Sequence, residues 1–435
     1  MIVAGGGLAG LAAAAALGGA GFEVDLFESR DFLGGRATSW PVSPESEIID
    51  NCQHVLLRCC VNLMDFYGRL GVAQRIRFYK KFYFIEPGGR TSTLERGKLA
   101  APNHFAGSFL RMKCLGLADK LGVARAMLAI PRERTRRTDL DRITMLEWLK
   151  EKGQTPRAIE RYWRPVLVSA VNEELDRMAA IHGFQVFWLG MLASADSYEM
   201  GVPEVPLRSL YAADAWDKIG RVAIHRRCPV QEIVVQDGRV SGVRVAEQLQ
   251  IADHYISALP FERIGSVAPG LALDTSAFEH SPITGIHLWF DRPVTDLPHA
   301  TLLDRTVQWM FNKSEGKYVQ LVVSASRSLT NRTREDIVAL AVNELREFFP
   351  RAREANLERA RVIKEIRATY SAKPGMESLR PPSRTAIPNL FLAGDWTRSG
   401  WPATMEGSVR SGYLAAEAVA RAAGNPKRFL LPDIA

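Results

Sequence analysis

Three glycines near the start of the chain have the spacing of a phosphate-binding turn. Gly5, Gly7 and Gly10 lie between an apolar run and an alanine-rich run, so we expect a strand, a tight turn and a helix. Gly5 permits the sharp bend, Gly7 lets a pyrophosphate approach the backbone, and Gly10 lets the helix pack close to the sheet. The free N–H groups at the start of the helix would then bind phosphate oxygens.

An acidic residue and a second glycine pair follow at positions that suit a dinucleotide site. Glu28 ends the next predicted strand, where a carboxylate accepts hydrogen bonds from a ribose diol. Gly34, Gly35 and Arg36 come next. A lone glycine motif is weak, but together with the strand, the helix and the acid it predicts dinucleotide binding. The alternative is a glycine-rich turn in an unrelated α/β domain.

The end of the chain carries a second candidate cofactor segment. A buried strand is predicted to run into Gly394 and Asp395, and an acid at a sharp strand end can hold a ribityl or phosphate hydroxyl. A helix is predicted to begin near Met405, Glu406 and Gly407, with its N–H groups toward a polar ring edge. Because these segments lie at opposite ends of the chain, the cofactor domain must be closed by its own C-terminal segment, with the substrate domain inserted.

The composition is that of a globular protein of two domains. The 435 residues are 47% hydrophobic and 24% charged, which excludes a disordered chain. The net charge of +8 permits binding to nucleic acid or to an anionic membrane and decides neither. The five cysteines show no C-x-x-C spacing, so we expect reduced thiols in a cytoplasmic protein without a metal site. We also expect no signal peptide and no membrane-spanning helix.

Residues 104–137 combine a wide apolar stripe with interleaved lysines and arginines. A basic amphipathic helix of this kind can lie on an anionic membrane surface. The alternative is a pair of packed helices with a solvated basic edge. The aromatic residues of the predicted helical stretch 156–200 either line an apolar pocket or fill a core, and core filling is their usual role.

The second half of the chain is predicted to contain both helices and strands. We expect the following elements: a helix over 210–219, a hairpin over 230–245, three strands between residues 283 and 325, and a helix over 334–348. The predicted fold class is α/β, a Rossmann-like cofactor domain with an inserted substrate domain of antiparallel sheet and helices. The predicted segments are 1–75, 206–265 and 376–435 for the cofactor domain, 76–205 for a substrate or cap domain, and 266–375 for the substrate sheet.

The glycine turn, Glu28, the Gly34-Gly35-Arg36 motif and the closing Leu392-Ala393-Gly394-Asp395 resemble the superfamily of FAD-dependent amine oxidases and carotenoid desaturases. Within it, residues 50–57, 367–370 and 395–408 resemble the bacterial squalene-associated FAD enzymes, the hydroxysqualene dehydroxylases of hopanoid biosynthesis. The resemblance spans nearly the whole chain. One departure is Cys52, which stands where we expect glycine, and its side chain can crowd the flavin or change the loop.

The resemblance implies FAD as the cofactor and assigns contacts to it. Gly5, Gly7, Gly10 and Arg36 would approach the phosphates, and Glu28 the adenosine ribose. The remaining predicted contacts are the backbone of Val230 with adenine, Asp395 with the ribityl-pyrophosphate region, Met405 with the flavin ring, and the neighbouring positions Leu8, Ala9, Ser29, Gly34, Gly35, Gly394, Glu406 and Gly407. The alternatives are a surface arginine for Arg36 and an ordinary strand residue for Val230.

The implied reaction is the reductive dehydroxylation of hydroxysqualene to squalene, with hydride passing from reduced flavin to an allylic carbon. A general acid near the flavin would protonate the leaving hydroxide, and His54, beside Gln53, is the candidate because histidine can be protonated near neutral pH. Asp50 would orient His54 or contact the cofactor. The alternative is a histidine that hydrogen-bonds only the backbone or the flavin.

Competing functions are a carotenoid-type desaturase, an amine oxidase, and a non-enzymatic escort protein that binds a prenylated partner. The expected partner is a long apolar isoprenoid, hydroxysqualene, and no nucleic acid, because no groove-reading motif is present. We expect a cytoplasmic protein that can associate peripherally with the inner face of the cytoplasmic membrane. The sequence leaves the oligomeric state and the source of electrons open.

Overall fold

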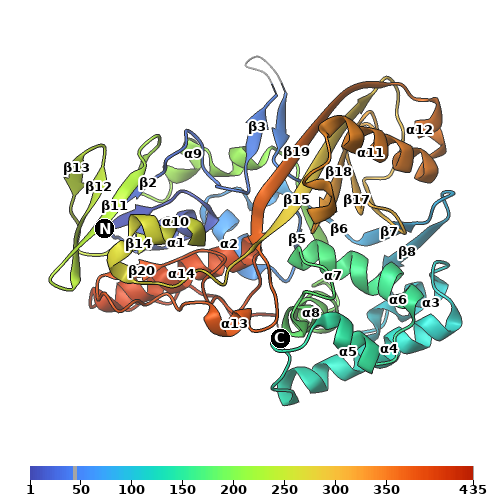
Figure 1. Ribbon diagram of the computed structural model, residues 1–435, viewed down its shortest axis with the longest axis horizontal. Helices are drawn as coiled ribbons and strands as arrows, with labels where there is room; N and C mark the ends of the chain where they lie inside the picture. The colour runs from blue at the N-terminus through green and yellow to red at the C-terminus, as the bar shows by residue number, and fades with distance from the viewer. Residues whose placement is uncertain (43–46, 435) are drawn as a thin grey trace.

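The computed structural model describes residues 1–42 and 47–434. Residues 43–46 and 435, which fall in the predicted first and closing cofactor segments, lie outside the described residues. Figure 1 shows a parallel sheet with its helices in one half, and a larger sheet above a helical layer in the other. Two long strands, β15 (His280–Phe290) and β19 (Leu357–Tyr370), run from the second half toward the first.

The parallel sheet holds the glycine turn. Its strand order is β10-β2-β1-β14-β20, and each of these neighbours pairs in parallel. The strands are β1 (Ile2–Ala4), β2 (Val24–Phe27), β10 (Val222–His225), β14 (Tyr255–Ser257) and β20 (Leu390–Leu392). The first, middle and last parts of the chain therefore share one sheet.

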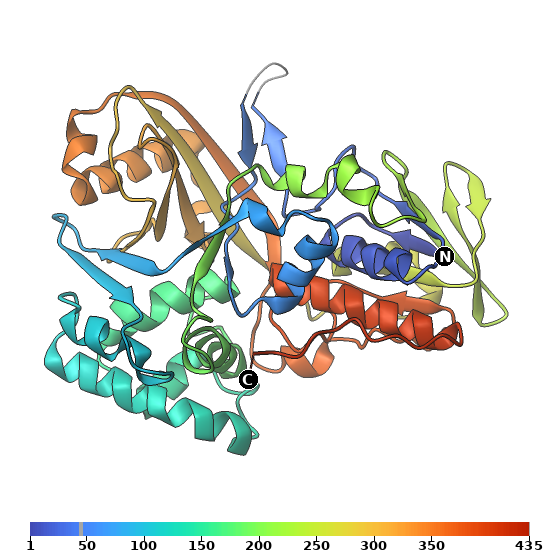
Figure 2. The same ribbon diagram turned by 180° about the vertical axis from the view of Figure 1, so that it is seen from behind.

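Two helices made largely of small residues lie side by side on this sheet. Helix α1 (Leu8–Gly19) contacts α14 (Met405–Ala422), as both views show (Figures 1 and 2). A Cβ atom on Gly412 would lie only 2.2 Å from the carbonyl oxygen of Ala9, so the two backbones approach too closely for any side chain. Helix α2 (Val61–Arg69) packs against α14 as well.

The predicted hairpin over 230–245 is confirmed as β11 (Val230–Gln236) and β12 (Arg239–Val245). Strand β13 (Gln248–Gln250) extends it. The smaller elements of this half are β3 (Ser39–Pro41), β4 (Ile48–Asp50), β5 (Leu56–Leu57), β6 (Ile76–Tyr79), β9 (Met200–Pro203) and α10 (Phe261–Val267).

The helix expected over 210–219 is wrong in extent. A 3-10 turn at Leu207–Tyr211 and a short helix α9 (Ala213–Trp216) take its place. The N–H group of Leu207 donates to the carboxylate of Asp50 at 3.0 Å, so a tertiary contact sets the start of the segment. Gly220, with φ of +64°, follows the helix with a left-handed residue.

The larger sheet has the order β19-β15-β18-β17-β16-β7-β8. Its other strands are β7 (Lys81–Ile85), β8 (Thr91–Glu95), β16 (His299–Leu302), β17 (Trp309–Ser314) and β18 (Tyr318–Ser324). Its pairs are antiparallel except β16 with β7, which is parallel. Predicted segments 76–205 and 266–375 thus contribute to one sheet. The strand β19 was not predicted.

Helices cover one face of this sheet. The helix predicted over 334–348 is confirmed as α11 (Arg334–Phe348), whose first turn is capped by the Thr333 hydroxyl accepting from Asp336 N–H. It is followed by α12 (Pro350–Glu354). Apolar residues of α11 and of the strands form one buried cluster. We call the opposite face of the sheet, which carries Gly285, His287 and Gln320, the inner face.

The helical layer contains α3 (Ala106–Arg111), α4 (Leu117–Arg136), α5 (Met145–Glu151), α6 (Pro156–Ala158), α7 (Arg164–Val171), α8 (Ala180–Phe187) and, near the cofactor half, α13 (Met376–Leu379). Trp148, Trp163 and Phe184 are buried in it and pack edge to face, so these aromatic residues fill a core. Among the described residues, no helix is long and apolar enough to cross a bilayer.

Candidate cofactor and active site

The glycine turn contacts the second glycine pair directly. Gly5 has φ of +109°, and its N–H group donates to the carbonyl of Phe27 at 2.8 Å. The N–H group of Gly34 donates to the carbonyl of Gly6 at 2.9 Å, and a Cβ atom on Gly35 would lie 3.1 Å from the Cα of Gly7. In the described chain, no side chain caps the start of α1. Its first N–H groups, which include those of Leu8 and Ala9, are therefore left for an anion.

Glu28 is held rigidly beside this turn. Its buried carboxylate accepts from the N–H groups of Gly6 at 2.7 Å and Arg30 at 2.8 Å, and from the Ser29 hydroxyl at 3.0 Å. The N–H group of Cys228 donates to the carbonyl of Glu28 at 2.9 Å. This contact brings the start of β11, and with it Val230, to the same corner. The roles of these residues toward a nucleotide stay predictions.

An ion pair joins the two ends of the chain. Arg36 contacts Asp395 at 2.6 Å, and it also donates to the carbonyl of Ala368 at 2.8 Å. Gly394, with φ of +141°, precedes the acid, and a Cβ atom there would lie 2.7 Å from the ring of Trp396. The Arg36 side chain remains 37% exposed, and a guanidinium has five N–H donors, so donors remain for a phosphate while Asp395 orients it.

At the start of α14, the protein itself engages groups of two predicted contact residues. The Glu406 carboxylate is buried and accepts from the Leu63 N–H at 2.7 Å and the Asn62 side chain at 2.9 Å, so it caps α2. The N–H group of Gly407 is bonded to the Thr404 hydroxyl at 3.0 Å. The Glu406 side chain and the Gly407 N–H group are therefore not available to a cofactor. Met405, half-buried at the first helical position, stays a predicted contact.

The loop that follows Arg36 forms a polar cluster with a lysine from the larger sheet. The Asp50 carboxylate is buried and accepts from the Ser39 hydroxyl at 2.8 Å. The Lys313 ammonium donates to Gln53 Oε1 at 3.0 Å and to Asp50 Oδ2 at 3.4 Å. The β17–β18 register shifts between Asn312 and Ser314, and such a bulge re-aims the side chain it contains.

Sequence reasoning missed Lys313. No motif surrounds it, and it stands 263 and 260 positions from its two partners, Asp50 and Gln53. The available signal is a lysine inside a stretch that otherwise reads as a half-buried strand, where a charged side chain needs a partner. The structure thus brings Asp50 and Gln53, two of the predicted catalytic residues, together around a cation that the sequence did not indicate.

His54 differs from the charged acid that the sequence suggested. Its Nδ1 donates to the carbonyl of Cys52 at 2.9 Å, which leaves Nε2 as an acceptor. Burial of the ring holds the pKa of His54 below its ordinary value. A neutral imidazole is a poor proton donor at neutral pH, so His54 in this state fits the alternative of a backbone-bonded histidine that can accept a hydrogen bond.

Cys52 fits its position because the facing strand offers a glycine. A Cβ atom on Gly285 of β15 would lie 3.2 Å from the carbonyl oxygen of Asn51 and 3.9 Å from the Cys52 sulfur. The larger sheet therefore lies directly against the loop. Burial raises the pKa of the Cys52 thiol to about 12, so it stays protonated and serves as a packing group.

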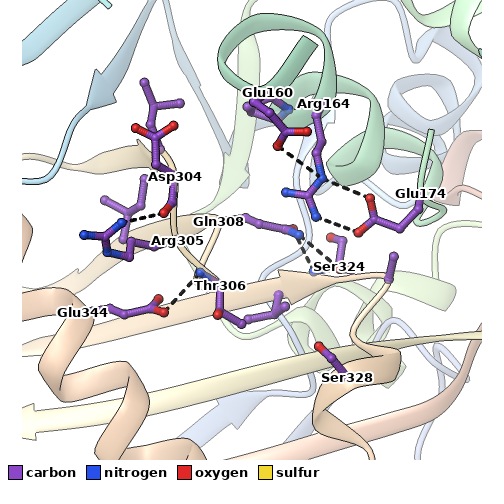
Figure 3. A pocket seen from close by; sticks show the side chains of 15 residues that line it. Glu160, Arg164, Glu174, Asp304, Arg305, Thr306, Gln308, Ser324, Ser328 and Glu344 are labelled. Carbon is purple, nitrogen blue, oxygen red and sulfur yellow. Dashed lines mark hydrogen bonds and ion pairs between the residues drawn. The ribbon is translucent and has the colours of Figure 1, made fainter. Parts of the chain in front are cut away.

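A cleft of about 720 Å³ lies elsewhere, between α7 and the ends of strands β16 and β18 of the larger sheet (Figure 3). Ion pairs line it, for example Arg164 with Glu174 at 2.7 Å. Gln308 there bonds the backbone of Ser324 with both of its amide atoms, at 2.9 and 3.2 Å. None of the predicted site residues lines this cleft. Its charged walls do not suit a hydrocarbon, so we place the active site at the cofactor segments instead.

Comparisons with known proteins identify the family. The family described as flavin containing amine oxidoreductase matches residues 8–420. The 15-cis-phytoene desaturase of Synechococcus elongatus is 26% identical over 96% of this chain and 95% of its own length. The zeta-carotene desaturase of Synechocystis is 27% identical, with 96% of each chain covered.

Solved structures share the fold. An oxidoreductase from Methanosarcina mazei superposes with a TM-score of 0.71 and 16% identity, over 94% of this chain and 98% of that one. A variant of putrescine oxidase gives 0.72 and 15%, with 97% of each chain covered. The glycine cradle, the uncapped start of α1 and the Arg36–Asp395 pair fit a flavin dinucleotide. The chain therefore belongs to the flavin containing amine oxidoreductase family, and its cofactor is FAD.

Proposed function

We propose that the protein catalyses the reductive dehydroxylation of hydroxysqualene to squalene. FAD in its reduced form supplies the hydride. The allylic C–O bond breaks, a C–H bond forms at that carbon, and the oxygen takes a proton to leave as water. An external two-electron reductant, for which dithionite substitutes in the assay, restores the reduced state. The sequence resemblance at residues 50–57 and 395–408 supports this substrate.

The observation that carries the proposal is the Lys313 cluster. Hydroxide leaves poorly from an apolar pocket unless a positive charge or a proton meets it. The ammonium of Lys313, held by Asp50 and Gln53, supplies both at the loop beside the cofactor segment. His54, neutral and bonded to the backbone, acts by accepting a hydrogen bond and orienting the alcohol. Removing hydride from a hydrocarbon creates no departing oxygen and gives such an ammonium no task.

A second candidate is a carotenoid-type desaturase. It is favoured by the phytoene and zeta-carotene desaturases, which match this chain over nearly their full length. An amine oxidase, suggested by the putrescine oxidase likeness, is less favoured because that similarity shows the fold alone. In both alternatives the substrate is oxidised and the flavin reduced, which is opposite to the proposed direction.

A product assay separates these functions. The dithionite-reduced holoenzyme, incubated anaerobically with hydroxysqualene, should release squalene. The oxidised holoenzyme, incubated with phytoene or zeta-carotene and a quinone acceptor, should release no further desaturated product. Squalene from the first reaction would support the proposal, whereas product from the second reaction alone would identify a desaturase.

We also propose that the protein docks on the inner face of the cytoplasmic membrane through α3 and α4. Leu110, Leu117, Leu121 and Leu128 are 58–72% exposed there. Leu117, Leu121 and Leu128 follow helical spacing along one side of α4. Neighbouring lysines and arginines suit anionic headgroups. A membrane-bound position would give a water-insoluble substrate a direct route to the protein.

A further inference from the structure

The inner face of the larger sheet holds buried polar groups that have no hydrogen-bond partner among the described residues. Gln320 of β18 is fully buried, and neither its amide oxygen nor its amide nitrogen has a partner there. His287 of β15 stands directly opposite it in the strand register. The Nδ1 atom of His287 is bonded to the Tyr318 hydroxyl at 2.7 Å, but Nε2 has no partner. Such groups are retained where a ligand or a water completes their hydrogen bonds.

These groups lie beneath the loop that carries Gln53 and His54. The loop touches the sheet at two places, at Gly285 on β15 and at Lys313 on β17. Strand β18 runs between β15 and β17, so the two contacts bracket Gln320. The unpaired amide and the unpaired ring nitrogen thus face the region where loop, sheet and cofactor segments meet.

The chemistry of the pair matches a neutral hydroxyl group. Burial lowers the pKa of His287 to about 4, so its ring is uncharged, and the glutamine amide is uncharged as well. An amine substrate would need an unpaired carboxylate, but the buried Asp50 is already engaged by Lys313. A hydroxyl both donates and accepts, so it satisfies either tautomer of His287 together with either end of the amide. Among the neighbours of the pair on this face, Phe311 and Val322 offer apolar surface, and the Trp309 indole is already bonded to Ser169. Arg361, opposite His287 on β19, is exposed to solvent.

We propose that Gln320 and the Nε2 atom of His287 bind the hydroxyl group of an allylic alcohol, and so select the alcohol over the hydrocarbon of the same skeleton. This inference rests on the proposed function, because it concerns the substrate of that reaction. Gln320 is a specificity-determining residue, and Lys313 remains the source of charge for the departing oxygen.

Binding to the oxidised holoenzyme, without reductant, tests this selection in the absence of turnover. Dissociation constants of hydroxysqualene and squalene are measured by perturbation of the flavin absorbance. The wild type should bind the alcohol about tenfold more tightly, the value of one well-formed hydrogen bond to a buried group. Gln320→Met should bring this ratio close to one. Gln320→Leu serves as a second variant if the first fails to fold.

Gln308→Met is the matched control, because Gln308 is a buried glutamine of the same sheet region whose amide is fully bonded. It should lower the melting temperature and keep the binding ratio. Gln320→Met removes an unpaired group, so the ligand-free melting temperature should stay equal or rise. A wild-type affinity ratio of alcohol to hydrocarbon near one would overturn the inference. So would a ratio that Gln320→Met leaves unchanged. If that unchanged ratio came with a lower melting temperature, Gln320 would be assigned to binding a structural water.

The outcomes also separate this inference from the reaction. If no squalene forms from the reduced enzyme but Gln320→Met abolishes a tenfold preference, alcohol selection stands and the proposed reaction fails. If squalene forms and Gln320→Met keeps the preference, the reaction stands and this inference fails.

Discussion

Three buried acids of the cofactor half differ from two buried polar groups on the inner face of the larger sheet in how the protein pairs them. In the cofactor half, Glu28, Asp395 and Glu406 are each held by partners from the protein itself. On the inner face, Gln320 and one nitrogen of His287 have none among the described residues. The protein itself therefore orients these acids of the cofactor half. The inner face leaves hydrogen bonds open at Gln320 and His287, which indicates where a ligand belongs.

The largest expected effect comes from adding a side chain to the glycine turn. A Cβ atom on Gly10 would lie 2.0 Å from the carbonyl oxygen of Gly5, so Gly10→Ala must displace α1 from the turn. We expect protein without bound FAD and a loss of stability of about 3 kcal/mol or more. Flavin content after purification and the melting temperature measure this.

Gly19→Ala, at the other end of the same helix, is the control, because its Cβ atom would meet nothing within 4 Å. This variant should bind FAD normally, and its free energy of unfolding should rise by up to about 1 kcal/mol. Normal flavin content in Gly10→Ala would show that the scaffold is looser than its geometry indicates.

The next largest effect is expected where the larger sheet meets the loop that carries Asp50 and Gln53. Lys313→Met removes the charge between Asp50 and Gln53, and squalene formation should fall by about 100-fold or more, with FAD retained. Single-turnover rates of the reduced holoenzyme measure it. Lys317→Met, an exposed lysine after the same strand, is the control and should keep the wild-type rate. A wild-type rate in Lys313→Met would exclude the lysine from the reaction.

How far the sequence predicted each region follows from the range of the contacts involved. The glycine turn, Glu28, the hairpin and α11 depend on spacing and composition within a few dozen residues, and the turn, the hairpin and α11 agree with the structure. Lys313 acts on a loop more than 250 positions earlier, and no local pattern reports such a meeting. The same holds for Gln320, whose significance is the lack of a partner rather than its place in a pattern.

Two features that the sequence did not indicate have the same cause. Glu406 stands at a predicted helix start beside a cofactor, and tertiary packing turns its carboxylate to the first turn of α2. The strand β19 mixes charged and apolar residues without strict alternation and is partly exposed, so its sequence does not distinguish it from a surface segment. Both are decided by neighbours that are remote in sequence.

A pH effect of intermediate size tests the cofactor half. Burial raises the pKa of Glu406 from 4.5 to about 7, so the folded protein holds this proton more tightly than the unfolded chain. The contribution of this proton to the free energy of unfolding is fully present below pH 4.5 and is lost as the pH rises through 7. The loss amounts to about 3 kcal/mol at most.

Glu406→Gln should remove this part of the pH dependence, as urea unfolding at several pH values would show. Glu417→Gln, on the same helix, is the control and should keep the wild-type slope, although it weakens the bond to the Phe429 N–H. An unchanged slope in Glu406→Gln would show that Glu406 is ionised in the folded protein throughout this range.

The smallest effect concerns the membrane. Leu121→Ser with Leu128→Ser should weaken binding to vesicles containing anionic lipid by several-fold to tenfold, because each buried leucine contributes about 1.5–3 kcal/mol when fully transferred and less when partly exposed. Sedimentation with vesicles measures it. Leu249→Ser, an exposed leucine in the cofactor half, is the control. Equal binding by both variants would place the membrane contact elsewhere.

The most direct test of the proposed reaction is the direction of electron flow. The holoenzyme is reduced anaerobically with one equivalent of dithionite and mixed with hydroxysqualene, and the flavin absorbance and the products are followed together. If reduced flavin passes hydride to the substrate, the oxidised flavin spectrum returns and one squalene forms for each flavin oxidised. A flavin that stays reduced with hydroxysqualene, but that becomes reduced when the oxidised enzyme meets a carotenoid precursor, would contradict it.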